Sequence, residues 1–202
     1  MNSPPSHHSL SGSLPEAGLS RGRAFLLFYG LVLMFLGLDQ ISKLLVLAYL
    51  PFGIPQPVLG NWFYFTQVHN IGAAFSILEG QKLWLSLIAG AVSIWILRYA
   101  HSLSRRHPLQ LAALACILAG ALGNLTDRLR LGYVVDFLDL HAGGRNIWPI
   151  FNVADMCINL GVGLLLLYFW RYEPKLNEGM LEEPSKEERS IISSSEASIK
   201  EI

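Results

Sequence analysis

The sequence predicts an all-α membrane protein: four transmembrane helices with a small extramembrane β element on the outer face. Two properties of the composition point to a membrane. Of the 202 residues, 52% are hydrophobic and only 15% are charged, whereas about 25% of a typical soluble domain is charged. The number of helices follows from four stretches that approach the roughly 20 apolar residues needed to cross a bilayer. The net charge of +0 gives no reason to expect nucleic acid as a partner.

The four predicted spans divide the chain into a membrane domain and two tails. The spans are residues 24–47, 83–99, 109–129 and 152–170. The first span is too long for a cleavable signal peptide and lacks a small-residue cleavage site at its end. We predict a four-helix transmembrane domain at 24–172. The Ser-, Pro- and Gly-rich segment 1–23 and the acidic segment 173–202, with its eight Glu, are expected to be disordered.

The distribution of Lys and Arg predicts the orientation in the membrane. Basic residues follow or precede the spans on one side: Arg21, Arg23, Arg98, Arg105, Arg106, Arg171 and Lys175. On the other side, the loop 48–81 contains no Lys or Arg, and the second loop carries only Arg130 and Arg145. Because basic loops stay in the cytoplasm, both termini should be cytoplasmic and the two long loops should face outward.

The two outer loops are expected to form the β element. Residues 61–68 (NWFYFTQV) are aromatic and partly alternating, which favours a strand, and Pro and Gly residues precede them. Residues 132–150 mix short apolar runs with Gly143, Gly144 and Pro149. We expect a short sheet over the outer mouth of the helices.

Ionisable residues are distributed unevenly among the spans. The second span has none between Leu83 and Leu97, whereas the other three carry several, all near the outer end. Such a side chain costs roughly 2.5–3.5 kcal/mol in the bilayer on insertion scales. The outer end is therefore the place to look for a functional site.

Helical spacing places these polar residues on shared faces. Each group has the i, i+3, i+4 or i+7 spacing that puts its members on one side of a helix. The groups are Asp39 with Lys43, then Asn124 with Asp127 and Arg128, and then Asn152 with Asp155 and Asn159. Gly120 and Gly123 allow close approach of a neighbouring helix, and Asp136 follows the third span between Val135 and Phe137.

Most of these acids have an ordinary structural explanation. Asp39 and Lys43 favour a structural ion pair, Asp127 can orient the third helix, and Asp139 is expected to be solvated in its loop. Asp155 can be a helix N-terminal carboxylate, although its stripe continues into the membrane. Spacing alone does not separate Asp136 from Asp127 as a catalytic candidate.

Several kinds of chemistry have no matching motif. The six His residues lack zinc-ligand spacing, no Gly-x-Ser-x-Gly sequence occurs, and no phosphate-binding glycine loop occurs. We therefore expect neither a metal nor a cofactor. Carboxylate chemistry remains, in which two close acids share one proton and activate water against a peptide bond.

Four motif blocks resemble the lipoprotein signal peptidase (signal peptidase II) family over residues 24–170. The blocks are Asp39-Gln40-x-x-Lys43, Asn70-Ile71-Gly72-Ala73-Ala74-Phe75, Gly123-Asn124-x-x-Asp127-Arg128 with Val134-Val135-Asp136-Phe137, and Phe151-Asn152-Val153-Ala154-Asp155. The resemblance implies a bacterial inner-membrane aspartyl peptidase. It would cleave a prolipoprotein before a diacylglyceryl-modified cysteine, with membrane lipids around it and no oligomer implied.

The resemblance also assigns roles to individual residues. It implies that Asp136 and Asp155 are the catalytic pair and that Asp39 and Lys43 are structural. Supporting and substrate-binding positions would be Asn70, Gly72, Asn124, Asp127, Arg128, Asn152 and Ala154.

Two other functions remain open at this stage. Buried charges also line the paths of small channels and transporters, although here the inner halves of the spans are apolar. A non-catalytic assembly factor that binds lipidated proteins is the third possibility.

Overall fold

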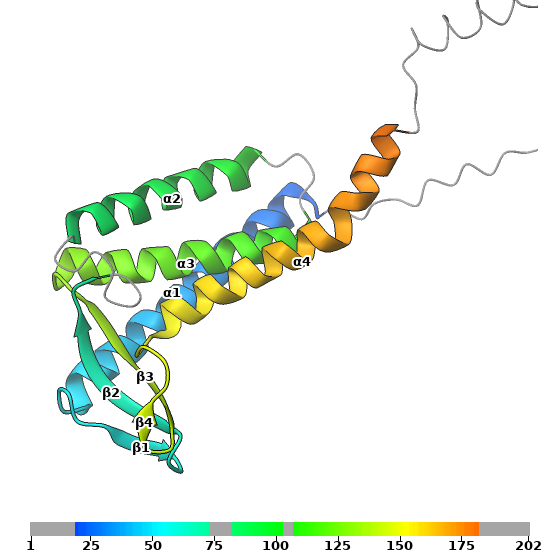
Figure 1. The fold of residues 1–202 in the computed structure, drawn as a ribbon. Helices are drawn as coiled ribbons and strands as arrows, with labels where there is room; N and C mark the ends of the chain where they lie inside the picture. The colour runs from blue at the N-terminus through cyan, green and yellow to red at the C-terminus, as the bar shows by residue number, and fades with distance from the viewer. Residues whose placement is uncertain (1–18, 73–81, 103–106, 182–202) are drawn as a thin grey trace, which may run out of the picture.

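Four helices and a small sheet make up the described part of the chain, residues 19–72, 82–102 and 107–181 of a computed structural model (Figure 1). The helices are α1 (Arg21–Tyr49), α2 (Lys82–Ser102), α3 (Pro108–Arg130) and α4 (Val153–Leu181). All four are long and apolar enough to cross a membrane, α4 over Val153–Tyr172. The predicted fold class is confirmed.

The helices extend slightly beyond the predicted spans. α1 begins at Arg21, within the predicted N-terminal tail, and α4 continues to Leu181, so the first part of the predicted acidic tail is helical. Residues 1–18 and 182–202, which hold the rest of both predicted tails, lie outside the described residues.

Helix α3 is the centre of the bundle and packs against α1, α2 and α4 (Figure 1). In its apolar stretch 67% of the residues are buried, against 22% or less in the other three helices. A side chain at Gly120 would collide with the main-chain oxygen of Ala154, and one at Gly123 would collide with Asp39. The predicted role of these two glycines in close helix approach is therefore confirmed.

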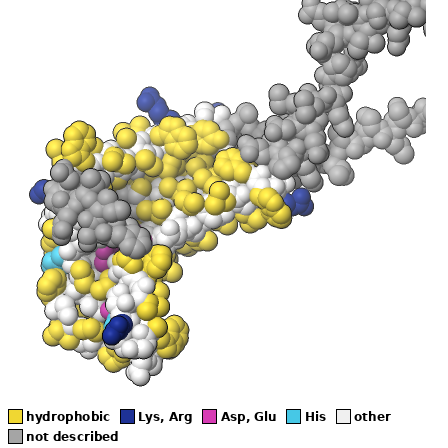
Figure 2. All heavy atoms as spheres, in the orientation of Figure 1, with side chains coloured by type: hydrophobic (Ala, Val, Ile, Leu, Met, Phe, Trp, Pro, Cys, Tyr) yellow, Lys and Arg dark blue, Asp and Glu magenta, His cyan; other side chains and the backbone are white. Residues whose placement is uncertain are grey.

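The end of the bundle remote from the sheet is held by apolar packing. We call this region the apolar half; its buried residues are Ala24, Phe28, Val32, Ile96, Ala100, Leu111, Leu114, Ala115 and Leu118. They come from α1, α2 and α3. On the face shown in Figure 2, apolar side chains cover the helices, and acidic side chains are visible only where the helices meet the sheet and on the sheet itself.

The sheet lies at the other end of the bundle and is antiparallel throughout, in the order β1-β2-β3-β4. Its strands are β1 (Gln56–Leu59), β2 (Phe63–Asn70), β3 (Val134–Ala142) and β4 (Arg145–Asn146). Strand β2 confirms the predicted strand, shifted slightly along the chain. Val46 near the end of α1 packs against Val135, Phe137 and Leu138 of β3, so the sheet is fixed to the helices.

The prediction of a solvated Asp139 was wrong. Asp139 lies within β3 and is 2% exposed. Its carboxylate accepts hydrogen bonds from Thr66 Oγ1 and Asn146 Nδ2, both at 2.6 Å, and lies 2.9 Å from His141 Nε2. Alternate residues of a strand share a face, so Asp139 points the same way as Val135 and Phe137. We call Asp139 and these three partners the hairpin cluster.

Candidate active site

A cavity of about 1110 Å³ opens where the sheet meets the ends of α3 and α4. Its polar lining includes most of the side chains singled out in the sequence: Asn70, Asn124, Arg128, Asp136, Asp155 and Asn159. The remaining lining is mainly apolar: Val68, His69, Ile71, Gly72, Val134, Leu140, Trp148, Pro149, Ile150, Phe151 and Ile158. The cavity thus combines two acids with an apolar wall.

Asp136 is delivered to this cavity by β3 and is almost completely buried, at 2% exposure. Its Oδ2 accepts a hydrogen bond from Asn70 Nδ2 at 2.8 Å, and its Oδ1 accepts one from Asn152 Nδ2 at 2.6 Å. Burial and the nearby charge of Asp155 raise the pKa of Asp136 to about 7, against the opposing effect of the two hydrogen bonds. A proton on this acid is therefore available near neutral pH.

Asp155 lies in the first turn of α4 and takes part in a capping box. Asn152 Oδ1 accepts a hydrogen bond from the Asp155 main-chain nitrogen at 3.0 Å. In return, Asp155 Oδ2 accepts from the Asn152 main-chain nitrogen at 3.1 Å. This reciprocal pattern starts helices, and the helix N-terminus favours a negative carboxylate. Asp155 also lines the cavity, so the structural explanation and the functional one apply to the same residue.

Asn152 connects the two acids. Its side chain donates to Asp136, and its main-chain nitrogen donates to Asp155. The main chain reinforces this link, because the nitrogens of Phe137 and Leu138 both donate to the oxygen of Phe151, at 3.0 and 2.8 Å. Strand β3 is thereby tied to the residue before Asn152. Since Asp127 does not line the cavity, the geometry separates Asp136 from Asp127 where spacing did not.

Arg128 and Asn70 hold the main chain of Gly72 at the cavity wall. Asn70 Oδ1 accepts from the Gly72 nitrogen at 2.9 Å, and an Arg128 guanidinium nitrogen donates to the Gly72 oxygen at 3.0 Å. Residues 73–75, which complete the second sequence block, lie outside the described residues. The predicted support residues Asn70, Gly72 and Arg128 are thus brought together by direct contacts.

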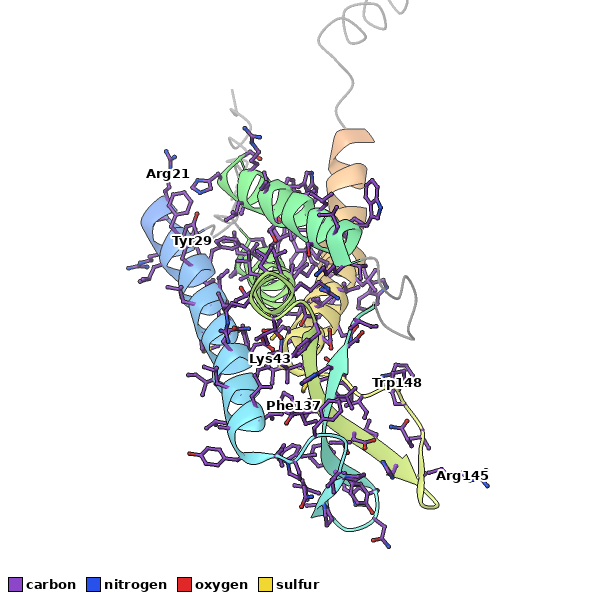
Figure 3. The ribbon with its side chains drawn as sticks, turned by 90° about the vertical axis from the view of Figure 1, so that its left-hand side faces the viewer. Arg21, Tyr29, Lys43, Phe137, Arg145 and Trp148 are labelled. Atoms are coloured by element: carbon purple, nitrogen blue, oxygen red, sulfur yellow. The ribbon has the colours of Figure 1, made fainter. Side chains whose placement is uncertain are left out.

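Behind the cavity lies a buried cluster of Asp39, Lys43 and Asp127, in which the predicted pair of Asp39 and Lys43 is present. Lys43 Nζ lies 3.0 Å from Asp39 Oδ2 and 2.9 Å from Asp127 Oδ2. Figure 3 shows Lys43 on α1 directed into the bundle near α3. Ala154 joins the cluster through its main-chain nitrogen, which donates to Asp39 Oδ1 at 2.9 Å. We call these three charged residues the ion cluster.

The part of the chain that the structure describes contains no set of side chains placed to ligate a metal ion. No three His, Cys, Asp or Glu side chains there lie close enough together to hold an ion.

Comparison with known proteins decides the family. A family model described as signal peptidase (SPase) II matches residues 31–171, a range that includes both cavity acids and the ion cluster. The chain belongs to the signal peptidase II family. Lipoprotein signal peptidase of Halothermothrix orenii is 40% identical over 145 residues, covering 72% of this chain and 96% of that protein. Lipoprotein signal peptidase of Moorella thermoacetica is 45% identical over 138 residues, covering 68% and 89%.

Solved structures of bacterial membrane enzymes share the fold. A bacterial membrane enzyme determined by the in meso method at 2.3 Å resolution matches with a TM-score of 0.64 and 26% identity, covering 84% of this chain and 96% of that one. A second bacterial membrane enzyme, determined at 1.9 Å by the same method, matches with a TM-score of 0.63 and 28% identity.

Sequence reasoning gave no role to two residues: Gln40, which lies behind the cavity in contact with the ion cluster, and His69. Gln40 Nε2 donates to Asp39 Oδ2, Asp127 Oδ1 and the Gly123 oxygen, at 3.1, 3.1 and 3.2 Å. Its position inside the first motif block was the available signal. His69 lines the cavity and stacks on Tyr133, with ring centroids 3.8 Å apart. Only its place beside Asn70 pointed to it.

Proposed function

We propose that this chain is an intramembrane aspartyl endopeptidase that removes signal peptides from diacylglyceryl-modified prolipoproteins, cleaving just before the lipidated cysteine. The observation that carries the proposal is that Asp136 and Asp155 both line one cavity and that Asn152 is hydrogen-bonded to both. Membership of the signal peptidase II family supports the class of substrate. Both relatives cited above are described as lipoprotein signal peptidases.

The two acids take different roles in the proposed reaction. Asp155, held by donors at the start of α4, is the ionised base that removes a proton from water, and the water attacks the peptide carbonyl. Asp136, with a pKa of about 7, is the acid that donates its proton to the carbonyl oxygen. The roles then reverse, and the leaving amine is protonated. Asn70 and Asn152 already occupy one lone-pair direction on each Asp136 oxygen, so the transferable proton occupies one of the other directions.

The apolar wall suits a lipid-bearing substrate. Leu140, Trp148 and Phe151 line the cavity together with Ile150 and Ile158. Apolar groups can leave the membrane for such a wall without entering water, whereas the scissile peptide needs the polar side. The proposed partners are therefore the diacylglyceryl-prolipoprotein and the surrounding membrane lipids, with no cofactor.

The proposed location is the bacterial inner membrane, with both termini cytoplasmic and the cavity near the outer face. The Lys and Arg distribution supports this orientation, because Arg21 and Arg23 flank the start of α1, whereas β1 and β2 at its other end contain neither residue type. In this arrangement the peptidase domain is 24–172, and the tails 1–23 and 173–202 are cytoplasmic.

A transport function receives less support from the same residues. An ion path needs polar groups along its length. The apolar half is filled instead by Phe28, Ile96, Leu111 and their neighbours.

The test is cleavage of a purified diacylglyceryl-prolipoprotein in detergent, with EDTA present. Wild type is compared with Asp136→Asn and Asp155→Asn, which keep side-chain size but cannot complete the proton transfers. Asp139→Asn is the matched control, because Asp139 is a buried acid of the same strand that does not line the cavity. We expect cleavage by wild type and by Asp139→Asn only.

Other outcomes have defined meanings. Near-normal turnover by Asp136→Asn or Asp155→Asn removes that residue from the pair. Activity that EDTA abolishes and zinc restores contradicts a metal-independent mechanism. Equal cleavage of an unlipidated precursor contradicts the lipid requirement. If folded wild type cleaves nothing, the peptidase proposal fails, and a non-catalytic assembly factor becomes the favoured hypothesis.

A further inference from the structure

Lys43 of the ion cluster makes three hydrogen-bonded contacts at a site shielded from solvent. The side chain is 2% exposed. Its ammonium nitrogen lies 3.0 Å from Asp39 Oδ2, 2.9 Å from Asp127 Oδ2 and 2.9 Å from Asn124 Oδ1. An ammonium group has three hydrogens and no acceptor. All three hydrogens of Lys43 therefore have a partner, and the three partners come from two helices.

Two of these partners, the carboxylates of Asp127 and Asp39, accept hydrogen bonds from the main chain next to the cavity acids. Asp127 Oδ2 accepts a hydrogen bond from the nitrogen of Val135 at 3.1 Å, and Val135 directly precedes Asp136. Asp39 Oδ1 accepts one from the nitrogen of Ala154 at 2.9 Å, and Ala154 directly precedes Asp155. One ammonium thus connects, through two carboxylates, the strand that carries one acid and the helix that carries the other.

The third partner, Asn124, reaches an acid directly. Because Lys43 can only donate, the Asn124 atom that faces it must be the oxygen, which leaves the amide nitrogen to face Asp155 Oδ1 at 2.8 Å. Asn152 Nδ2 also donates to the Asn124 oxygen, at 3.1 Å, and to Asp136. The charge on Lys43 therefore favours the orientation in which Asn124 presents an N–H group to Asp155. Through the Asn124 oxygen it also supports the orientation of Asn152, whose own oxygen accepts from the Asp155 main-chain nitrogen.

We propose that Lys43 is a positioning residue of the hydrolytic site: it sets the spacing of Asp136 and Asp155 and the direction in which Asn124 and Asn152 donate. This inference rests on the proposed peptidase function. It goes beyond a structural ion pair, because a pair needs only Asp39, whereas the contacts to Asn124 and Asp127 continue to the acids. Without the cation, Asn152 Nδ2 alone holds the Asn124 oxygen. Rotation of the Asn124 amide then costs less, and the rotated oxygen repels the Asp155 carboxylate.

Removal of Lys43 should also change the pH dependence of turnover. The charged and titratable groups that face the two acids come from every neighbouring element: Asp39 and Lys43 of α1, His69 of β2, and Asp127 and Arg128 of α3. Arg128 and His69 remain in a Lys43 variant, but the cation that favours negative charge on the acids is lost. The alkaline limb of the pH profile, which reports loss of the Asp136 proton, should then move to higher pH.

The experiment compares Lys43→Met with Gln40→Met in the full chain, on the lipidated precursor. The pair is matched, since Gln40 is on the same helix and its amide nitrogen, with two hydrogens, lies within hydrogen-bond distance of three acceptors. Two of these acceptors are carboxylates of the ion cluster, and none belongs to Asn124. For Lys43→Met we expect kcat per folded molecule to fall about 100-fold, as when one preorganised donor is lost, with KM nearly unchanged. Gln40→Met should lower thermal stability and keep the wild-type pH profile.

A purely structural Lys43 predicts a different result. Both variants would then lose folded protein alike, and the folded fraction would keep the wild-type kcat and pH profile. That result overturns the proposal. If Lys43→Met does not fold, Lys43→Gln replaces it, because the glutamine amide can still donate to Asp39 and Asp127 but no longer fixes the Asn124 amide. Wild-type kcat in folded Lys43→Gln also overturns the proposal.

Failure of the proposed function itself is distinguishable. In that case wild type does not cleave, or Asp136→Asn and Asp155→Asn cleave normally, whatever Lys43→Met does.

Discussion

The two ends of the helix bundle are held together by different forces. The apolar half relies on close packing of residues such as Phe28, Ile96 and Leu114, which are 2% exposed or less. The end beside the sheet relies on hydrogen bonds and ion pairs, and its buried side chains include Lys43 and Asn152 at the same low exposure. These side chains are equally buried at the two ends, yet those of one end are mostly apolar and those of the other include many polar groups.

This difference indicates that the end beside the sheet contributes less to stability than a purely apolar end would. Side chains of the apolar half need no partners, whereas each buried polar group at the other end needs several and loses stability if one is missing. A membrane bundle can be built from packing and small residues alone. We interpret the polar end as the place of the proposed chemistry, and we expect substitutions at the two ends to affect different quantities.

Replacement of Asn152 by Leu should have the largest effect on turnover. The change removes the donor to Asp136 and half of the capping box with Asp155. Loss of a preorganised donor costs about 100- to 1,000-fold in kcat, and loss of the cap about 1 kcal/mol. Measurement of kcat and thermal unfolding separates the two effects. A variant that is unstable but turns over at the wild-type rate when folded would place Asn152 outside the chemistry.

Raising the pH should have the next largest effect on turnover. The pKa of Asp136 is raised from its usual value to about 7, so the acid keeps its proton below that pH and loses it above. If Asp136 is the proton donor, kcat should fall about tenfold per pH unit on the alkaline side. In Asn70→Leu, one bond that favours the ionised form is absent, so this limb should move to higher pH. A profile that stays flat well above pH 7 would contradict the assignment of Asp136.

Replacement of Asp139 by Leu should have a smaller effect, mainly on substrate binding. It leaves the hairpin cluster partners Thr66 and Asn146 without their acceptor. The loss at buried Thr66 costs about 1–3 kcal/mol, whereas exposed Asn146 can bond to water instead. The chain after β4 continues into the cavity wall at Trp148, so KM should rise while kcat stays close to wild type. Arg145→Ala is the control, since Arg145 lies at the tip of the hairpin, away from the helices (Figure 3).

Replacement of Ile96 by Ala should leave kcat per folded molecule unchanged. Ile96 is 1% exposed within the apolar half. Truncation of a buried Ile costs about 2–5 kcal/mol, because the cavity left behind only partly closes. Thermal unfolding in detergent measures this loss, and turnover of the folded fraction checks the rest. A large drop in kcat would show that the two ends are energetically coupled.

The helices were predictable from the sequence because the bilayer fixes their length and composition. Faces of single helices were predictable too, since Asp39 and Lys43 lie one turn apart. Contacts between distant elements were not. Asp139 was misjudged because the sequence analysis placed it in a loop, whereas it lies within β3 and is buried against Thr66 of the neighbouring strand β2. Asp136 and Asp127 were separated by the cavity, which Asp136 lines and Asp127 does not. That cavity depends on contacts such as the Phe151 bridge between β3 and the start of α4, which local spacing does not encode.

The ion pair on α1 also bears on how the chain is made. α1 leaves the ribosome first, and the partners that Lys43 finds in α3, Asp127 and Asn124, are synthesised only after the whole of α2. Because Asp39 and Lys43 lie one turn apart, the part of α1 that follows Arg23 can enter the membrane without net charge. The lysine then acquires its other two partners when α3 inserts. Biogenesis of the site is thereby divided into a local step and a later assembly step, and only the second creates a centre able to cut peptides.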